Sequence, residues 1–115
     1  MKDSRMNFFK WVIQSMAGTR SQELPTGALL IDVRSLGDFS SGHIDGAISL
    51  PLASIAQTIS TVVPDKAAVV IVYCRSGARS SAAKRALARL GYENVSNGGG
   101  VRKLALMLHK EIRCA

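Results

Sequence analysis

The sequence predicts an α/β fold in which helices cover both faces of a parallel sheet. Short apolar runs alternate along the chain with segments whose apolar residues recur at helical spacing. Strands that alternate with helices are typical of a parallel sheet covered on both sides. The run 67–73 is rich in valine and follows Pro64-Asp65-Lys66, as expected of a central strand that is buried on both faces.

The first half of the chain contains two shorter strands and two helical segments. The apolar runs 28–33 and 47–50 predict strands, and a short helical turn is expected over 36–41 between them. Apolar residues then recur at helical spacing from Leu52 to Val63, which predicts a helix over 52–63. That helix leads into the central strand over 67–73.

In the second half, a helix is predicted over 81–90, because Ala83, Leu87 and Leu90 lie on one side of it and Gly91 can end it. A strand over 94–96 and a helix over 101–110 complete the chain. The glycine run 98–100 is no dinucleotide-binding fingerprint, because no strand-to-helix unit with an acidic partner follows it. A turn that requires positive φ explains these glycines.

The chain of 115 residues has room for one domain. We expect an N-terminal amphipathic helical extension over 1–21 and the folded domain over 22–115. Apolar side chains between Phe9 and Met16 are spaced to share one face of that helix, and the stretch is too short to span a bilayer. The helix is expected to pack on the domain or on a second copy, which leaves a monomer or a weak homodimer. Contact with a membrane surface through Lys2, Arg5, Lys10 and Arg20 is the alternative.

The chain is strongly basic, with a net charge of +7 and a pI near 10.0. Basic residues are spread along the chain without a run of five or six, and only 5% of residues are aromatic. These features favour small anionic substrates over nucleic acid.

The two cysteines, forty residues apart and without a credible secretory signal, predict reduced thiols in the cytoplasm. Cys114 is expected to be an exposed bystander, because a resolving role would require the C-terminal tail to fold back onto Cys74. His43 and His109 are the only histidines, and neither pairs with a cysteine at ligand spacing, so no metal site is expected.

The segment Cys74-Arg75-Ser76-Gly77-Ala78-Arg79-Ser80 joins the central strand to a helix. A short loop at such a junction can turn successive backbone N–H groups inward, and the following helix adds the positive end of its dipole. Such a cradle binds anions and lowers the pKa of a cysteine within it. Cys74 is therefore the predicted nucleophile.

Asp32 and Arg34 end the first predicted strand, so they can reach the same edge of the sheet as Cys74. For Arg34 we favour a structural ion pair, for instance with Asp38. For Asp32 a structural role and support of the Cys74 loop are equally open. His43 is expected to hold backbone groups as a neutral side chain.

The loop resembles the active-site loop of the rhodaneses, small sulfurtransferases that carry sulfur as a cysteine persulfide. Ile31-Asp32-Val33-Arg34, Gly42-His43-Ile44-Asp45-Gly46-Ala47 and Gly98-Gly99-Gly100-Val101 are similar to the family's other signatures, and the resemblance spans about 24–108. Leu104 stands where the family often has a tryptophan, a difference expected to affect packing. The resemblance implies a five-stranded parallel sheet whose first strand comes from near the N-terminus.

The resemblance also implies the chemistry. The Cys74 thiolate would take the outer sulfur of thiosulfate, and the N–H groups of the loop, from Arg75 through Ser76, Gly77, Ala78 and Arg79 to Ser80, would hold the persulfide. Arg79, with Arg75, would bind the sulfonate group. Cyanide, a thiol or a thioredoxin-like protein would accept the sulfur, and neither a metal nor an organic cofactor is required.

Two other functions are compatible with this loop. Phosphatases and arsenate reductases related to rhodaneses share its layout, but they resemble it with five residues between cysteine and arginine, and only four separate Cys74 from Arg79. A shorter ring of donors leaves room for one extra sulfur atom and crowds a phosphoryl group. A non-enzymatic sulfur-carrier or interaction module is the other alternative, although such domains typically lack the cysteine.

Overall fold

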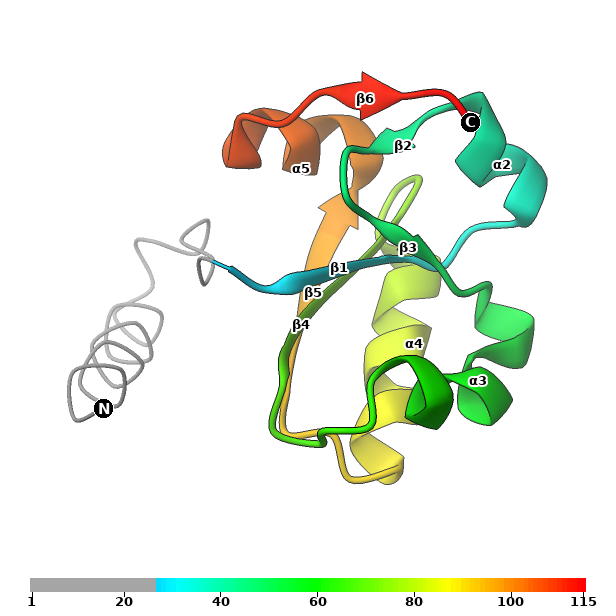
Figure 1. The fold of residues 1–115 in the computed structure, drawn as a ribbon, viewed down its shortest axis with the longest axis vertical. Coiled ribbons are helices and arrows are strands. Elements are labelled where there is room, and N and C mark those ends of the chain that lie inside the picture. The colour runs from blue at the N-terminus through cyan, green and yellow to red at the C-terminus, as the bar shows by residue number, and fades with distance from the viewer. Residues whose placement is uncertain (1–26) are drawn as a thin grey trace, which may run out of the picture.

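The structure is a computed structural model that describes residues 27–115. The expected amphipathic helix, its membrane contact and the domain boundary near residue 22 lie outside these residues. Figure 1 shows the order of the elements, which are β1 (Leu29–Asp32), α2 (Leu36–Ser41), β2 (His43–Ile44), β3 (Ile48–Ser49), the short 3-10 helix η1 (Leu52–Ser54), α3 (Ile55–Val62), β4 (Val69–Cys74), α4 (Ala78–Arg89), β5 (Asn94–Gly100), α5 (Val101–Leu108) and β6 (Ile112–Arg113).

The fold is the expected α/β fold, built on a parallel sheet with strand order β3-β1-β4-β5. Residues 27–115 supply four strands to it, one fewer than the family resemblance implied, and the strand expected near the N-terminus lies outside the described residues. A second sheet pairs β2 with β6 in antiparallel orientation. The sequence did not predict this pair, because neither β2 nor β6 lies in an apolar run.

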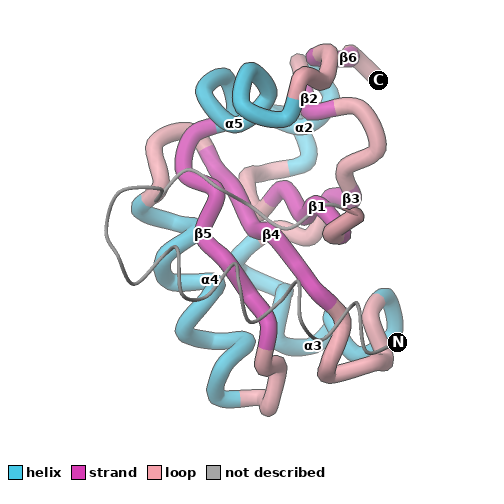
Figure 2. The backbone as a smooth tube through the Cα atoms, turned by 90° about the vertical axis from the view of Figure 1, so that its left-hand side faces the viewer, coloured by secondary structure: helices cyan, strands magenta, loops and turns pink. Residues whose placement is uncertain are grey.

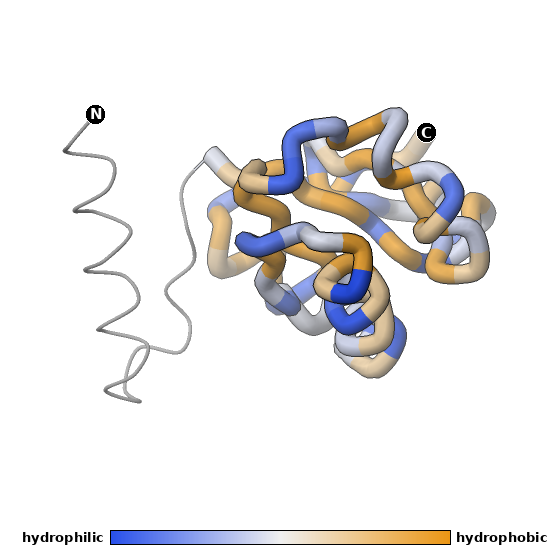
Figure 3. The backbone as a smooth tube through the Cα atoms, turned by 90° about the horizontal axis from the view of Figure 1, so that it is seen from below, coloured by the Kyte–Doolittle hydropathy of each residue, from blue (hydrophilic) through white to orange (hydrophobic). Residues whose placement is uncertain are grey.

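Alternate side chains of each strand point to opposite faces of the sheet, and a buried cluster covers each face. Val70, Val72 and Cys74 of β4 belong to a buried cluster with residues of α3 and α4. Ile71 and Tyr73 belong to a second cluster with Ile44 of β2 and with residues of α5. Figure 2 shows α5 at the end of β4 and β5 and α4 packed along them, and Figure 3 shows hydrophobic stretches of chain running through the interior of the fold.

Two element boundaries differ from the prediction, and both differences involve the Cys74 loop. Helix α4 begins at Ala78 and not at residue 81, because Gly77, with φ of 106°, turns the chain directly into the helix. Strand β5 continues from residue 96 to Gly100, with a register shift opposite Val72 and Tyr73 of β4. The prediction of a positive φ in the glycine run is confirmed at Gly99, where φ is 82°.

Two helices are also shorter than predicted. The segment predicted as a helix over 52–63 divides into η1 and α3, and α5 ends at Leu108. Leu104, which stands where rhodaneses often have a tryptophan, is fully buried in the cluster beneath α5. Among residues 27–115, no helix has the length and apolar character needed to cross a membrane.

Candidate active site

Cys74 is the last residue of β4, and the turn that follows it wraps back around its sulfur. The side chain is 1% exposed. Its Sγ accepts hydrogen bonds from the backbone N–H of Gly77 at 3.0 Å and of Ser80 at 3.4 Å. Both donors lie at the start of α4, where free N–H groups and the helix dipole favour an anion. The structure therefore places Cys74 in the predicted cradle.

The environment of Cys74 has opposing effects on the pKa of its thiol. Burial raises this pKa, but hydrogen bonds from the Ser80 hydroxyl and from the N–H groups of Ser80, Gly77 and Ser76 together outweigh burial. The net result lowers the pKa from 9.0 to about 7. A substantial fraction of Cys74 is therefore the nucleophilic thiolate at neutral pH.

Ser80 is fully buried beneath this sulfur, and its hydroxyl has three neighbours. Its Oγ lies 2.6 Å from Oδ1 of Asn97, 3.1 Å from the Gly77 carbonyl oxygen and 3.5 Å from the Cys74 sulfur. The Asn97 amide group donates in turn to the Gly77 carbonyl oxygen and to the Ser81 hydroxyl. Asn97 thus links β5 to the first turn of α4.

The sequence prediction missed Asn97, because its predicted strand ended at residue 96 and the following residues were assigned to a turn. In the structure Asn97 pairs in register with Val72 of β4, two residues before the nucleophile. A polar residue on the strand next to the nucleophile's strand was the available signal.

The Cys74 loop also packs directly on the glycine run of β5. A Cβ atom added to Gly100 would lie 2.5 Å from the carbonyl oxygen of Arg75, and one added to Gly77 would lie 3.5 Å from the Cα atom of Gly99. Within the glycine run, a positive φ therefore explains the need for glycine at Gly99 only. At Gly100 the close approach of the Arg75 backbone excludes a side chain.

Asp32 and Arg34 form a buried ion pair with each other. Nη2 of Arg34 lies 2.7 Å from Oδ2 of Asp32, and Nε lies 3.0 Å from Oδ1. The same Nη2 donates to the Gly42 carbonyl oxygen at 2.6 Å. The ion pair expected for Arg34 is present, but its partner is Asp32 and not the suggested Asp38. Residues two apart in extended chain point to the same side, so Asp32 is the nearer carboxylate.

His43 holds the backbone, as the sequence analysis expected. Its Nδ1 lies 2.9 Å from the carbonyl oxygen of Phe39, so this nitrogen donates to it. The imidazole also stacks on the Phe39 ring, with the ring centroids 3.8 Å apart. His43 therefore fixes the end of α2, and it is not among the hydrogen-bond partners of the Cys74 sulfur.

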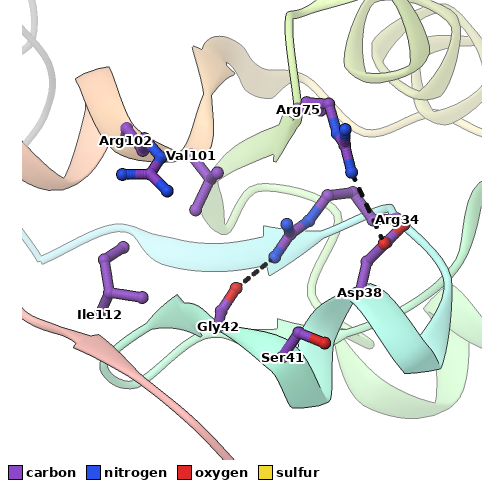
Figure 4. Close-up of a pocket in the computed structure, with 8 residues that line it drawn as sticks. All are labelled: Arg34, Asp38, Ser41, Gly42, Arg75, Val101, Arg102 and Ile112. Atoms are coloured by element: carbon purple, nitrogen blue, oxygen red, sulfur yellow. Dashed lines mark hydrogen bonds and ion pairs between the residues drawn. The ribbon is translucent and has the colours of Figure 1, made fainter.

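A pocket of about 510 Å³ opens beyond the carboxyl ends of the strands (Figure 4). The residues that line it come from the turn after β1, from α2, from the Cys74 loop, from α5 and from β6, and they are Arg34, Asp38, Ser41, Gly42, Arg75, Val101, Arg102 and Ile112. Cys74 itself does not line the pocket, but Arg75 does. Asp38 and Arg75 face each other across it, with Oδ1 and Nη2 3.9 Å apart.

The other predicted site residues are divided between the loop and its outer surface. Ser76, Gly77, Ala78 and Ser80 surround the sulfur or begin α4. Arg79 is exposed in the first turn of α4, and neither an ion pair within residues 27–115 nor the pocket involves it. Arg102 and Ile112 line the pocket and were not predicted. Cys114 is exposed, as expected, and its thiol donates to the Ser41 carbonyl oxygen at 3.4 Å.

The fold and the loop define a class of protein, namely α/β proteins with a buried cysteine in a turn of inward-facing N–H groups at the carboxyl end of a parallel strand. The chain belongs to the family of rhodanese-like domains, which matches residues 10–103.

The chain is similar to two sulfurtransferases and to a rhodanese of known structure. The thiosulfate sulfurtransferase PspE of Escherichia coli is 42% identical over 76 residues, which cover 66% of this chain and 73% of that protein. The thiosulfate:glutathione sulfurtransferase of Saccharomyces cerevisiae is 32% identical over 79 residues, which cover 59% of this chain and 57% of that protein. A solved structure of a rhodanese with anions from E. coli superposes with a TM-score of 0.64 at 41% identity, covering 66% of this chain and 89% of that one.

Proposed function

We propose that this protein is a thiosulfate sulfurtransferase that carries sulfur on Cys74. The observation that carries the proposal is the set of donors around the Cys74 sulfur, which lowers its pKa to about 7. Membership of the rhodanese-like family and the similarity to a thiosulfate sulfurtransferase support the choice of substrate.

The reaction proceeds in two displacements. In the first, the Cys74 thiolate attacks the outer sulfur of thiosulfate, the bond between the two thiosulfate sulfurs breaks, and sulfite leaves with the bonding electrons. The N–H groups of Gly77 and Ser80, which already donate to Sγ, stabilise the anionic persulfide. Arg79, with Arg75, is proposed to bind the sulfonate group and to stabilise charge on the departing sulfite.

In the second displacement, a nucleophilic acceptor attacks the outer sulfur of the persulfide, the bond from Sγ to that sulfur breaks, and Sγ returns to the thiolate. With cyanide the product is thiocyanate, and with a thiol it is the persulfide of that thiol. A thioredoxin-like protein is a third class of acceptor.

We also propose a cytoplasmic location. Both cysteines are free thiols, as is typical of proteins in a reducing compartment.

Steady-state kinetics with thiosulfate and cyanide test this function. We expect thiocyanate to form with ping-pong kinetics, Cys74→Ser to abolish its formation, and Cys114→Ser to leave it intact. Aryl phosphates, the substrates of the alternative phosphatase function, are expected to turn over poorly or not at all. Phosphate release that matches thiocyanate formation in the unmodified protein would overturn the proposal.

A further inference from the structure

The pocket beyond the strand ends begins one residue past the nucleophile. Cys74 of β4 pairs in register with Gly100 of β5. Arg75, which follows Cys74, and Val101, which follows Gly100, both line the pocket. Its walls thus continue from the two strands that hold the sulfur and the loop, so a molecule in the pocket lies next to the Cys74 loop.

The pocket is too large for the small substrates of the assay. Its volume of about 510 Å³ falls within the range of about 300–1,000 Å³ that is typical of pockets for organic ligands. Thiosulfate and cyanide are far smaller and would leave most of this space filled with water. The size therefore points to a larger molecule, and of the two displacements only the second can use a larger substrate.

The charges in the pocket favour an anion. The carboxylate of Asp32, which does not line the pocket, neutralises Arg34, with Nη2 of Arg34 lying 2.7 Å from Oδ2 of Asp32. Nη2 of Arg75 lies 3.9 Å from Oδ1 of Asp38, which is a long ion pair, and the Arg75 side chain is 73% exposed. Arg102 forms no ion pair with another residue of 27–115. Two carboxylates thus oppose three guanidinium groups, and the surplus positive charge lies on Arg75 and Arg102.

The remaining wall is apolar and comes from two different segments. Val101 begins α5, and Ile112 belongs to β6, which the antiparallel pairing with β2 holds in place. Figure 4 shows Val101 and Ile112 on the same side of the pocket as Arg102. A ligand that fits this wall combines an anionic group with an apolar or extended body.

We propose that this pocket is the acceptor subsite, and that it takes a low-molecular-weight thiol bearing a carboxylate. Arg102, with Arg75, binds the carboxylate, and the body of the acceptor lies against Val101 and Ile112. The anionic Cys74 persulfide takes a proton from solvent, and the acceptor thiolate then attacks its outer sulfur. The new bond joins acceptor sulfur to outer sulfur, and the Cys74 thiolate leaves with the electron pair of the broken bond. This inference rests on the proposed function, because it assigns the acceptor of that reaction.

Single-turnover kinetics test the subsite directly. The protein is loaded with thiosulfate, freed of excess donor and mixed with glutathione, which carries carboxylates, or with 2-mercaptoethanol, which is neutral. Arg102→Ala is expected to lower the second-order rate constant for glutathione by about three- to tenfold, the loss of one exposed charged contact. The rate constant for 2-mercaptoethanol is expected to change by less than about twofold, because that thiol lacks a carboxylate for Arg102 to bind.

Lys103→Ala is the matched control, because Lys103 is the next residue of α5, is also cationic and exposed, and does not line the pocket. Arg102→Lys should recover part of the glutathione rate. Equal losses for both thiols, or an equal effect of Lys103→Ala, would overturn the proposal. So would a loss in the thiosulfate half-reaction that exceeds the loss with glutathione, since the pocket would then serve the donor.

A binding measurement separates this inference from the proposed function. S-Methylglutathione cannot accept sulfur, so its binding to the unloaded protein, followed by calorimetry, requires no persulfide. We expect weaker binding to Arg102→Ala than to Lys103→Ala. If no persulfide forms in the wild type, the proposed function fails while this comparison still tests the pocket. If the persulfide forms but the two variants bind equally, only the acceptor subsite is wrong.

Discussion

At the residue scale, the pKa of Cys74 depends on the hydrogen-bond donors around its sulfur. Of the hydrogen bonds that lower the Cys74 pKa, the one from the Ser80 hydroxyl contributes most. The thiolate is the reactive form, so alkylation and sulfur uptake by the wild type should increase as the pH rises through about 7 and decrease about tenfold per unit well below it.

Ser80→Ala should move this profile to higher pH. Loss of a full hydrogen bond to a charged group corresponds to roughly 1.5–3 kcal/mol. The Ser80 hydroxyl lies 3.5 Å from Sγ and shares its one proton with Oδ1 of Asn97 at 2.6 Å, so we expect an upward pKa shift of at most about one unit. The pH dependence of alkylation by iodoacetamide, in a Cys114→Ser background, measures it. Ser81→Ala is the control, because Ser81 meets the same Asn97 without contacting the sulfur. An unchanged or lowered pKa in Ser80→Ala would contradict this assignment.

Substitution of Arg79 tests a second property of the site, the binding of the sulfur donor thiosulfate. If Arg79 binds the sulfonate group, Arg79→Ala should lower kcat/KM for thiosulfate by about one to two orders of magnitude, because one charge-assisted contact is lost. The cyanide half-reaction from a preformed persulfide should change less, since cyanide has no sulfonate group. Stopped-flow measurement of both half-reactions, with the exposed Arg85→Ala on the same helix as control, separates the two. Equal losses in both would mean that Arg79 shapes the loop instead.

At the scale of elements, the Cys74 loop packs on the glycine run of β5. Gly100 has φ of −88° and ψ of 151°, a conformation open to any residue, so Gly100→Ala acts only through its new methyl group. That group would lie 2.5 Å from the Arg75 carbonyl oxygen and would push the loop away from β5.

We expect Gly100→Ala to reduce the rate of sulfur uptake by at least about tenfold, since displacement of a cradle by a fraction of an ångström weakens its hydrogen bonds to the sulfur. Single-turnover release of sulfite measures this. Gly37→Ala in α2 is the control, because the nearest atom to its added Cβ lies 3.9 Å away. Wild-type sulfite release by Gly100→Ala would show that the loop does not need this contact.

The Asp32–Arg34 pair joins the end of β1 to the Gly42 turn before β2. Both side chains are buried, at 0% and 7% exposure, so Asp32→Ala leaves a buried guanidinium group without its partner. We expect a loss of about 3–5 kcal/mol in the free energy of unfolding, measured by urea denaturation. Asp45→Ala removes the half-exposed pair with Arg113 and should cost less than about 1 kcal/mol. Similar losses in the two variants would refute a stabilising role for the buried pair.

At the scale of the whole molecule, the parts of the fold that repeat along the sequence were predictable. The valine-rich β4 and the helices that flank it have periodicities that follow from packing on a sheet. The Cys74 loop was predictable for the same reason, because its residues are contiguous and its cradle is local. The β2–β6 pair was not, since His43 and Arg113 meet only after the chain has folded.

The site beyond the loop depends on contacts between distant segments. Asn97 reaches Ser80 only because β5 lies in register beside β4. Arg102 and Ile112 reach Arg75 only because α5 and β6 close over the strand ends. No spacing within one segment encodes these contacts. The partner of Arg34 is different, because Asp32 lies two residues away on the same side of extended chain and its contact is therefore local.

The central claim, that Cys74 carries sulfur, is tested most directly by the intact mass of the protein before and after incubation with thiosulfate. We expect the wild type and Cys114→Ser to gain the mass of one sulfur atom while sulfite appears, and cyanide or excess thiol to remove it. Cys74→Ser should gain nothing. A sulfur adduct that persists in Cys74→Ser, or a wild type that gains no mass although its Cys74 is alkylated readily, would contradict the account.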